Sequence, residues 1–374
     1  MSLVGLDWPV SSYTGWGVFG LHLALAIERQ GKAKPVLFHP PAIDLDSVRA
    51  ARFRAFEVRP LPSAPLDFPV LRALGNDGQR ITAIEGSLDR GLIFFENTEF
   101  SPQGLAGLGS LKTLIAGSAW NGALLAEAGL GNVAVRPQGV DETLFFPAAR
   151  MGLWRERFVV FSGGKIELRK GQDIVLRAFA RFHARHPEAL LVTAWHNFST
   201  DRLADMARSP HGVGPVPKDA KGLPDFAAWA AANGLAPDAF LDLGFRSNRE
   251  MGAILRECDA ALFPNRAEGG TNLVAMECLA SGLPTILAAN TGHLDLTESV
   301  PCFPLRRQAP VDRTLAGMAC AGWGESDLEE IDQRLEAIYA DRKGARELGH
   351  ESAKAMLAWT WSIRARAMAE ALGF

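Results

Sequence analysis

The sequence has few cysteines, no excess of charge and no long apolar run, and each shortage excludes a class of protein. Its four cysteines, in 374 residues, show no Cys-x-x-Cys spacing, which argues against a disulfide framework or a zinc site. The net charge of −3 argues against a dedicated nucleic-acid binder, but it leaves room for a local basic site. No segment reaches the roughly 20 consecutive apolar residues of a membrane-spanning helix.

The cysteine usage and the first residues also bear on where the protein acts. Scattered thiols are typical of a reduced compartment. The chain starts with a strand-like segment in place of the charged and apolar regions of a signal peptide. We therefore expect a cytoplasmic protein. These features do not test peripheral attachment to the inner face of a membrane, which is kept as an alternative.

The length and the order of apolar segments predict two α/β domains. A chain of 374 residues exceeds the usual limit of about 250 to 300 residues for one core. Short apolar runs alternate with helical patterns, which is typical of parallel sheets with crossover helices. Strands are expected at Ser2–Leu6, Pro35–Phe38, Gly91–Phe95, Thr113–Ala116, Val133–Arg136, Phe158–Gly163, Leu190–Ala194, Ala239–Leu243, Ala260–Phe263 and Thr285–Ala288. Helices are expected at Gly17–Arg29, Gln172–His183, Asp225–Asn233, Glu250–Cys258, Asn272–Ala280, Leu328–Ile338 and Ala345–Leu372.

The division between the domains is expected after the turn-like segment Arg136–Asp141, within Pro147–Trp154. This gives a first domain of residues 1–150 and a second of residues 151–355, followed by residues 356–374. The stretch from His196 to Pro237 is rich in Pro, Gly and Asp, and we expect it to decorate the second domain as a loop with one helix.

The segment Ala260–Pro284 reads as a strand, a glycine-rich loop and a short helix. Thr271 is the expected helix N-cap, and Gly282 the left-handed residue that ends the helix. Gly269 and Gly270 would let the backbone approach a ligand closely. Free N–H groups at the start of a helix attract an anion such as a diphosphate.

Glu277 lies on the apolar face of this predicted helix, at helical spacing from Leu273, Val274 and Ala280. An unpaired buried carboxylate is costly, so fixed donors should hold it. The two hydroxyl groups of a ribose beside the diphosphate would serve. A structural glutamate paired with a buried arginine or with backbone N–H groups is an equally good explanation from this residue alone.

A second signal is the segment Phe161–Asp173, at the end of the first strand of the second domain. Ligands of open α/β sheets bind at this edge. Two glycines followed by Lys165 and Lys170 suit a diphosphate leaving group, because ammonium groups neutralise its developing charge without a metal. The alternative is a solvated basic loop.

A third signal is the Gly-x-Gly-x-x-Gly pattern of Tyr13–Gly20 after the first strand. A dinucleotide site needs an acidic residue at the end of the second strand, but that strand ends in Phe38-His39-Pro40. We therefore expect a loop that faces the cleft, with Gly15 or Gly17 close to the phosphates of a ligand.

Weaker candidates follow two other strands. Glu96, Asn97 and Glu99 come after Gly91–Phe95 and could contact a second substrate, although a helix cap explains Asn97 as well. His293 also follows a strand and could face a bound sugar.

Together these segments resemble family 4 of the glycosyltransferases, retaining enzymes of the GT-B fold. The similarity covers nearly the whole chain. Its most specific part is the paired-glutamate motif Glu268–Glu277, and it extends to Gly15–Gly20, Gly164–Gly171, Ser118–Asn121, Gln138–Asp141, Phe145–Pro147 and Leu243–Phe245. The resemblance implies two Rossmann-like domains facing a central cleft, with the last helix, near Trp359–Leu372, returning to the first domain.

The resemblance also implies a reaction and roles for residues. A UDP- or GDP-type sugar would be the donor, and a hydroxyl of a glycan, lipid-linked or protein molecule the acceptor, in bacterial glycan synthesis. Catalytic roles fall to Lys165, Lys170 and Glu268. Donor binding falls to Gly15, Gly17, Gly270, Thr271, Asn272, Leu273 and Glu277. The acceptor side falls to Glu96, Asn97 and Glu99.

No metal or organic cofactor is expected. The one Asp-x-Asp, Asp44-Leu45-Asp46, lies far in sequence from the predicted donor site. Three features depart from the family pattern: eight residues separate Glu268 from Glu277 in place of seven, Lys165 replaces an arginine, and the active-site histidine of the first domain is not evident. Alternatives are therefore a catalytically weak nucleotide-sugar-binding subunit, or another GT-B enzyme such as an epimerase or hydrolase. A nicotinamide dehydrogenase is a weaker alternative.

Overall fold

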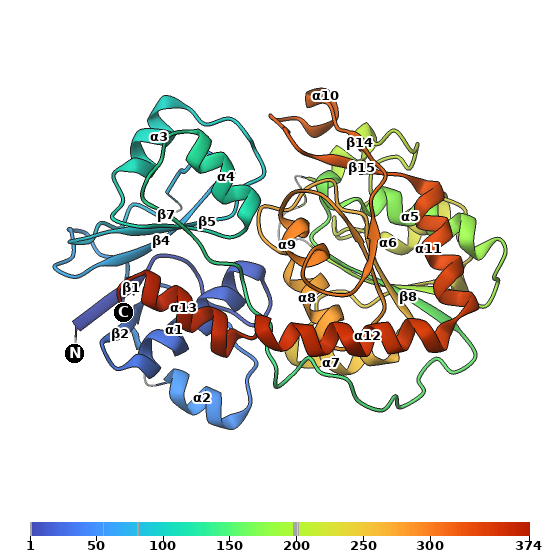
Figure 1. Ribbon diagram of the computed structural model, residues 1–374, viewed down its shortest axis with the longest axis horizontal. Coiled ribbons are helices and arrows are strands. Elements are labelled where there is room, and N and C mark those ends of the chain that lie inside the picture. Colours follow the sequence, from blue (N-terminus) through green and yellow to red (C-terminus); the bar gives the residue numbers. More distant parts are fainter. Residues whose placement is uncertain (1, 55, 81, 197–199, 201) are drawn as a thin grey trace.

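Two parallel sheets organise the chain (Figure 1). The computed structural model describes residues 2–54, 56–80, 82–196, 200 and 202–374. The first sheet has the order β3-β2-β1-β4-β5-β6-β7. Its strands are β1 (Ser2–Leu6), β2 (Ala33–Leu37), β3 (Glu57–Val58), β4 (Val70–Leu74), β5 (Arg90–Ile93), β6 (Leu114–Ala116) and β7 (Val133–Val135). Helices α1 (Gly15–Gln30), α2 (Ser47–Arg54), α3 (Pro102–Gly109) and α4 (Ala119–Glu127) connect them.

The second sheet has the order β10-β9-β8-β11-β12-β13. Its strands are β8 (Phe158–Gly164), β9 (Ala189–Trp195), β10 (Phe240–Asp242), β11 (Ala260–Phe263), β12 (Thr285–Ala288) and β13 (Phe303–Leu305). The helices are α5 (Gln172–His183), α6 (Phe226–Ala232), α7 (Asn248–Glu257), α8 (Leu273–Ala280), α9 (Leu294–Thr297), α10 (Arg313–Ala316), α11 (Leu328–Ala340), α12 (Arg342–Met356) and α13 (Trp361–Ala371). The 3₁₀ turns are η1 (Leu168–Lys170), η2 (Leu203–Arg208), η3 (Pro237–Ala239), η4 (Thr291–His293) and η5 (Leu357–Trp359), and β14 (Gln308–Pro310) pairs with β15 (Gly324–Ser326).

In both sheets the strand order reverses at the first strand, which is the doubly wound arrangement that places ligands at the carboxyl ends of the strands. Alternation along β8 shows how each face is covered. Phe158 and Val160 pack in a core with α5 and α11, while Val159 and Phe161 pack in a second core with α7 and α8. The predicted α/β architecture of two Rossmann-like units is confirmed.

The last helix belongs to the core of the first domain. Trp361, Ala365 and Met368 of α13 are buried with α1 and β1, and Figure 1 shows α12 and α13 in line across both domains. The prediction of one helix over Ala345–Leu372 is wrong, because the chain extends at Thr360. There the Trp359 carbonyl and the Trp361 N–H pair with the backbone of Val140, both at 2.9 Å.

A central strand, β4, was absent from the expected strands. Arg72 stands in its middle and is fully buried, where it pairs with Asp89. Within the described chain no helix is long and apolar enough to cross a bilayer. Residues 197–199 and 201 of the predicted loop after His196 lie outside the described residues; Phe226–Ala232 forms the expected helix within that stretch.

Candidate active site

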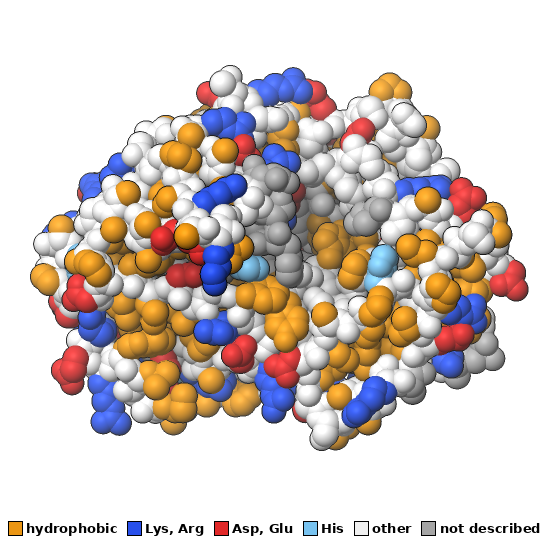
Figure 2. All heavy atoms as spheres, turned by 180° about the vertical axis from the view of Figure 1, so that it is seen from behind, with side chains coloured by type: hydrophobic (Ala, Val, Ile, Leu, Met, Phe, Trp, Pro, Cys, Tyr) orange, Lys and Arg blue, Asp and Glu red, His pale blue; other side chains and the backbone are white. Residues whose placement is uncertain are grey.

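The carboxyl ends of β8, β11 and β12 face the carboxyl end of β5 across the junction of the two domains. Viewed from behind, the molecule is hollowed where the domains meet (Figure 2). The residues that follow these four strands supply most of the polar groups of the site, as the doubly wound topology requires.

The turn η1, after β8, carries Arg169 and Lys170. Gly171 has φ +72°, and a Cβ there would lie 2.5 Å from the Pro264 carbonyl oxygen, so this position requires glycine. The close approach lets the Arg266 N–H donate to the Arg169 carbonyl at 2.7 Å. The turn is therefore fixed to the loop that carries Glu268.

Arg266 fixes the turn a second time. Its guanidinium is fully buried, donates to the Leu168 carbonyl and forms a bidentate pair with Asp173 at 2.9 and 2.6 Å. It also contacts Glu325, at 3.0 Å for the longer of two bonds. Bidentate charge-assisted bonds of this kind give strong geometric specificity. Arg266 thus fixes the backbone of the turn that carries Arg169 and Lys170.

Glu268 is the anion at the centre of the site. Its carboxylate accepts from Lys170 and Asn265, and the Arg169 guanidinium lies 3.3 Å away. Burial opposes ionisation, but the charges of Lys170 and Arg169 lower the pKa of Glu268 to about 2. Glu268 is therefore ionised at neutral pH and holds the Lys170 ammonium in place.

Glu96 joins this cluster from the first domain. Its carboxylate lies 3.3 Å from the Arg169 guanidinium and accepts from the Gly269 N–H at 3.3 Å. Burial raises the pKa of Glu96, against the attraction of Arg169. Glu96 thus forms a buried ion pair between the domains.

Lys165 lies at the edge of the cluster, with 61% of its side chain exposed. Its ammonium pairs with Glu167 at 2.7 Å, and Glu167 in turn pairs with Arg169 at 2.8 Å. Burial opposes ionisation of Glu167, but Arg169 and Lys165 lower its pKa to about 2. Lys165 and Lys170 are therefore linked through intervening charges rather than by direct contact.

The start of α8 differs from the prediction in one residue. Asn272, and not Thr271, is the N-cap: its side chain accepts from the Ala275 N–H at 3.4 Å. The Thr271 hydroxyl contacts the sulfur of Met276. Asn272 has φ +58°, and Thr291 of the adjoining η4 has φ +41°. Strained backbone at two non-glycine residues of one edge is a common property of functional sites.

His293 lies behind the N-cap. Its Nε2 is 3.2 Å from the Asn272 side-chain amide, and the ring is fully buried. Burial lowers the pKa of His293 to about 4, so the ring is neutral at physiological pH. His293 therefore supports the Asn272 conformation, and a direct contact with a sugar stays a prediction.

Glu277 is buried, and its partner is neither an arginine nor the backbone. Asn248, at the start of α7, donates its side-chain amide to the Glu277 carboxylate at 2.8 Å. Burial raises the pKa of Glu277 to about 8. Among the described residues no cation forms an ion pair with Glu277, so the salt-bridged alternative is wrong, whereas ribose binding is untested.

Of the two glycines predicted to approach the phosphates, Gly17 is buried and Gly15 is exposed, and the closeness of Gly15 to a donor stays a prediction. The Gly17 N–H donates to the N-cap hydroxyl of Thr14 at 3.1 Å, so it is already occupied. A Cβ on Gly15 would lie 3.9 Å from the Leu273 side chain, which places these two residues against each other across the junction.

The glycines after β11 serve the contact between the domains. A Cβ on Gly269 would lie 2.6 Å from the backbone of Phe95, and one on Gly270 would lie 2.9 Å from Gln138. The Gly269 carbonyl accepts from the Ser118 hydroxyl at 2.7 Å. Close approach to the first domain therefore explains these glycines without a ligand.

Asn97 and Glu99 lie farther out than Glu96. The Asn97 amide donates to the Glu99 carbonyl at 2.8 Å, and the Glu99 carboxylate pairs with Arg313 of the second domain with both side chains 64% exposed. The expected helix cap falls to Ser101 and not to Asn97. The acceptor roles of Glu96, Asn97 and Glu99 remain predictions.

Within the described residues no group of three or more His, Cys, Asp or Glu side chains is arranged to hold a metal ion. The Asp-x-Asp pair is engaged otherwise, since Asp44 accepts from the Ser247 hydroxyl at 2.7 Å and Asp46 pairs with Arg49.

Sequence reasoning missed several residues of the site, among them Arg169, Arg266 and Asn248. Arg169 stands beside Lys170 in the same basic turn, and this adjacency was the available signal. Arg266 follows Asn265 inside the glycine-rich segment, where a buried arginine has no distinguishing pattern. Asn248 reaches Glu277 only through the packing of α7 against α8, so no local signal existed.

Comparisons with known proteins agree with this architecture. No family model matches the chain. A D-inositol 3-phosphate glycosyltransferase of Stackebrandtia nassauensis is 32% identical over 170 residues, which cover 43% of this chain and 34% of that protein. The match thus spans about a third of the relative's length.

Solved structures are similar over the whole chain. Sucrose-phosphate synthase of Thermosynechococcus elongatus has a TM-score of 0.69 at 14% identity and covers 100% of this chain and 98% of its own. Anabaena HepE in complex with UDP and glucose has a TM-score of 0.68 at 14% identity and covers 100% and 99%. The same protein in complex with UDP-glucose has a TM-score of 0.65 at 16% identity, covering 100% and 99%. The chain therefore has the GT-B fold, with two α/β domains.

Proposed function

We propose that this protein is a retaining glycosyltransferase of the family 4 type, which transfers a hexosyl group from a UDP- or GDP-sugar to a hydroxyl acceptor without a metal or organic cofactor. The observation that carries the proposal is the buried Lys170–Glu268 pair at the carboxyl edge of the second sheet, beside the start of α8. A cation held in place beside helix-start N–H groups is suited to a diphosphate.

The donor would lie along the second domain. The diphosphate would approach Lys170, Lys165 and the first amides of α8, from Gly270 to Leu273, with its ribose hydroxyls donating to Glu277. Glu268 would orient Lys170 and meet the sugar. HepE, which binds UDP and UDP-glucose, has the same fold over its full length, and this supports the choice of donor class.

The reaction needs no nucleophile from the protein. The bond between the anomeric carbon and the diphosphate breaks, and the diphosphate takes the electron pair. The acceptor hydroxyl attacks the same face of the sugar, and its proton passes to the departing phosphate oxygen. Lys170 stabilises the charge that develops there, which lowers the barrier more than it strengthens ground-state binding. The acceptor would enter beside Glu96, Asn97 and Glu99.

The proposal is tested by incubating the purified protein with UDP-, GDP- and ADP-sugars, a panel of hydroxyl acceptors and EDTA. We expect one donor to yield nucleoside diphosphate and a glycosylated product with the anomeric configuration of the donor, as determined by NMR. Inverted configuration would exclude the retaining mechanism, and activity restored only by Mn²⁺ or Mg²⁺ would exclude metal independence. Donor binding without turnover until cell extract is added would favour a binding subunit, and altered free sugar without transfer an epimerase or hydrolase.

A further inference from the structure

The connection from β7 to β8 exposes apolar side chains outside the candidate active site. Phe146 is 43% exposed, Met151 63% and Leu153 58%. Figure 1 shows this connection along the lower edge of the second domain. We call Phe146, Met151 and Leu153 the linker apolar residues.

The backbone beneath these side chains is held in place. The N–H groups of Met151, Gly152 and Leu153 all donate to the Glu257 carboxylate, the last two at 2.8 Å. Arg150 pairs with Asp259 at 2.8 Å. The exposure of Met151 and Leu153 is therefore a property of a fixed turn that presents both side chains outward.

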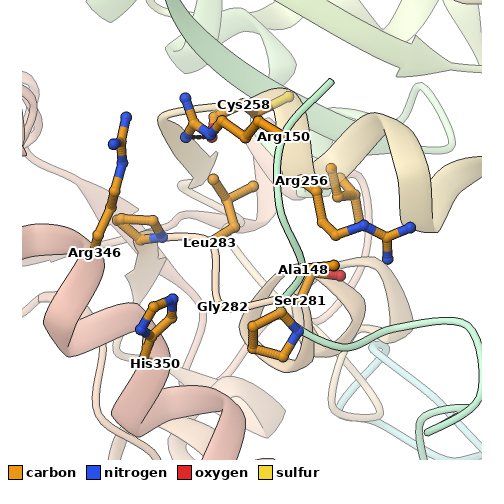
Figure 3. Close-up of a pocket in the computed structure, with 12 residues that line it drawn as sticks. Ala148, Arg150, Arg256, Cys258, Ser281, Gly282, Leu283, Arg346 and His350 are labelled. Carbon is orange, nitrogen blue, oxygen red and sulfur yellow. Dashed lines mark hydrogen bonds between the residues drawn. The ribbon is translucent and has the colours of Figure 1, made fainter. Parts of the chain in front are cut away.

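Arginines surround the linker apolar residues. Two adjoining cavities, of about 210 and 260 Å³, lie between the connection, α7 and α12 and share Arg150 and Arg346. Their walls include Arg150, Arg155, Arg157, Arg256, Arg342 and Arg346. In Figure 3, Arg346 and His350 come from α12, and Arg256 lies on the opposite side of the cavity with its guanidinium directed away from them.

The acidic residues of these walls neutralise only part of the arginine charge. Glu257 and Asp259 are the two carboxylates, so six arginines leave an excess of four positive charges, whereas the whole chain carries −3. Glu257 accepts from the three linker amides, whereas Asp259 pairs with Arg150 at 2.8 Å and with Arg346 at 3.1 Å and also accepts from the Val159 N–H at 2.9 Å. In the described part of the chain, Arg155 and Arg256 form no ion pair. The Ser281 hydroxyl, which lines the first cavity, is buried without a hydrogen-bond partner in the described residues.

This surface lies at the opposite edge of the second sheet from the candidate active site. Its walls adjoin the first residues of β8, β11 and β12, whereas the candidate site follows their last residues. A large ligand could therefore occupy the surface and leave the candidate site open.

We propose that the linker apolar residues and the surrounding arginines dock the protein on an anionic lipid bilayer. Arginines contribute attraction to anionic headgroups, and exposed apolar side chains gain by entering the boundary between headgroups and acyl chains. A surface that joins both properties on a fixed turn matches this partner in charge and in polarity. The proposal is independent of the transfer reaction.

The test is co-sedimentation of the full chain with vesicles of phosphatidylcholine, with and without added phosphatidylglycerol. We expect binding only to the anionic vesicles, and weaker binding at higher salt. The double variant M151D/L153D and the single variant Arg155→Glu should each lower vesicle affinity on the order of tenfold, since one surface charge changes membrane affinity about fivefold. These side chains are exposed, so melting temperatures should stay close to wild type.

Matched controls use the same changes elsewhere. Leu223→Asp alters a leucine that is 55% exposed, and Arg366→Glu alters an exposed arginine on α13; both should bind vesicles like wild type. Equal binding to neutral vesicles, or unchanged binding of M151D/L153D and Arg155→Glu, would overturn the proposal. Thermal stabilisation by inorganic phosphate without vesicle binding would overturn it as well, and would assign the cavities to a small phosphorylated ligand.

Discussion

The Glu96 carboxylate of the first domain lies 3.3 Å from the Arg169 guanidinium of the second, and both groups are largely buried. Around them the domains exchange further bonds. The Thr98 N–H donates to the Ala319 carbonyl at 3.0 Å, and the Asn248 N–H donates to the Ser12 carbonyl at 3.2 Å. The ion pair thus belongs to an interface that joins the two domains.

Replacing Glu96 by alanine should loosen this interface. Arg169 loses one of its three carboxylates and the Gly269 N–H loses its acceptor, so amide hydrogen exchange at Gly269 should accelerate by about tenfold, equivalent to about 1.4 kcal/mol. Exchange in β8 and β9 should be unchanged. Glu99→Ala removes an exposed ion pair across the same interface and should change these rates less than about twofold. Equal effects of the two variants would contradict a special role for the buried pair.

Glu277 should make the stability of the fold depend on pH. Burial raises its folded-state pKa from 4.5 to about 8, so between these values the folded chain holds a proton that the unfolded chain releases. Its contribution to stability is therefore complete below pH 4.5 and declines as the pH rises towards 8, by up to about 1.4 kcal/mol per pH unit. The melting temperature of wild type minus that of Glu277→Gln should fall over this range. Parallel curves for the two proteins would refute the buried, protonated carboxyl group.

Arg266 should contribute strongly to the stability of the fold through its buried ion pair with Asp173. Arg266→Ala leaves Asp173 buried without a cation, which costs about 3 to 5 kcal/mol. Arg181→Ala, which breaks a half-exposed pair with Glu329, should cost less than about 1 kcal/mol. Urea unfolding monitored by circular dichroism measures both. A loss below about 1 kcal/mol for Arg266→Ala would show that the buried pair is not needed to hold the turn.

The fold could be predicted from the sequence because apolar runs and helical periods agree with one another along most of the chain. The strand β4 was not predicted because Arg72 interrupts its apolar run, and Asp89, the partner of Arg72, lies in another segment. The break between the last two helices at Thr360 was not predicted for a similar reason, because it depends on pairing with Val140, which is remote in sequence.

The residues of the candidate site also differ in whether local sequence patterns could identify them. Glu268, Glu277 and Lys170 could be found because each stands in a short segment with glycines and a strand end. The Asn248–Glu277 bond and the Glu96–Arg169 pair arise from packing between elements and between domains, so local patterns could not show them. Gly269 and Gly270 were recognised for the right property, close backbone approach, but their observed neighbours belong to the first domain.

The two lysines of the glycine-rich turn should differ in their effect on the rate. Lys170→Ala removes a buried cation that faces Glu268 and should lower kcat about a hundred- to a thousandfold, the typical loss for one preorganised contact to developing charge. Lys165→Ala removes a cation that is 61% exposed and should lower kcat less than about tenfold. Steady-state kinetics with the donor found by the panel test this order. A larger loss of kcat for Lys165→Ala would show that Lys165, at the edge of the cluster, makes the main contact with the leaving group.

The central claim is that a nucleotide-sugar donor binds to the second domain with its ribose on Glu277, and calorimetric titration of UDP and GDP tests it most directly. We predict that Glu277→Gln weakens the binding of the preferred nucleotide roughly ten- to a hundredfold, because the amide cannot reproduce both ribose hydrogen bonds and a buried hydrogen-bonding group left without its partner costs about 1 to 3 kcal/mol. The control variant Glu330→Gln, at a buried glutamate bonded to the Arg307 N–H far from the site, should bind like wild type. Unchanged affinity in Glu277→Gln together with a lowered melting temperature would make Glu277 a structural residue and contradict the account.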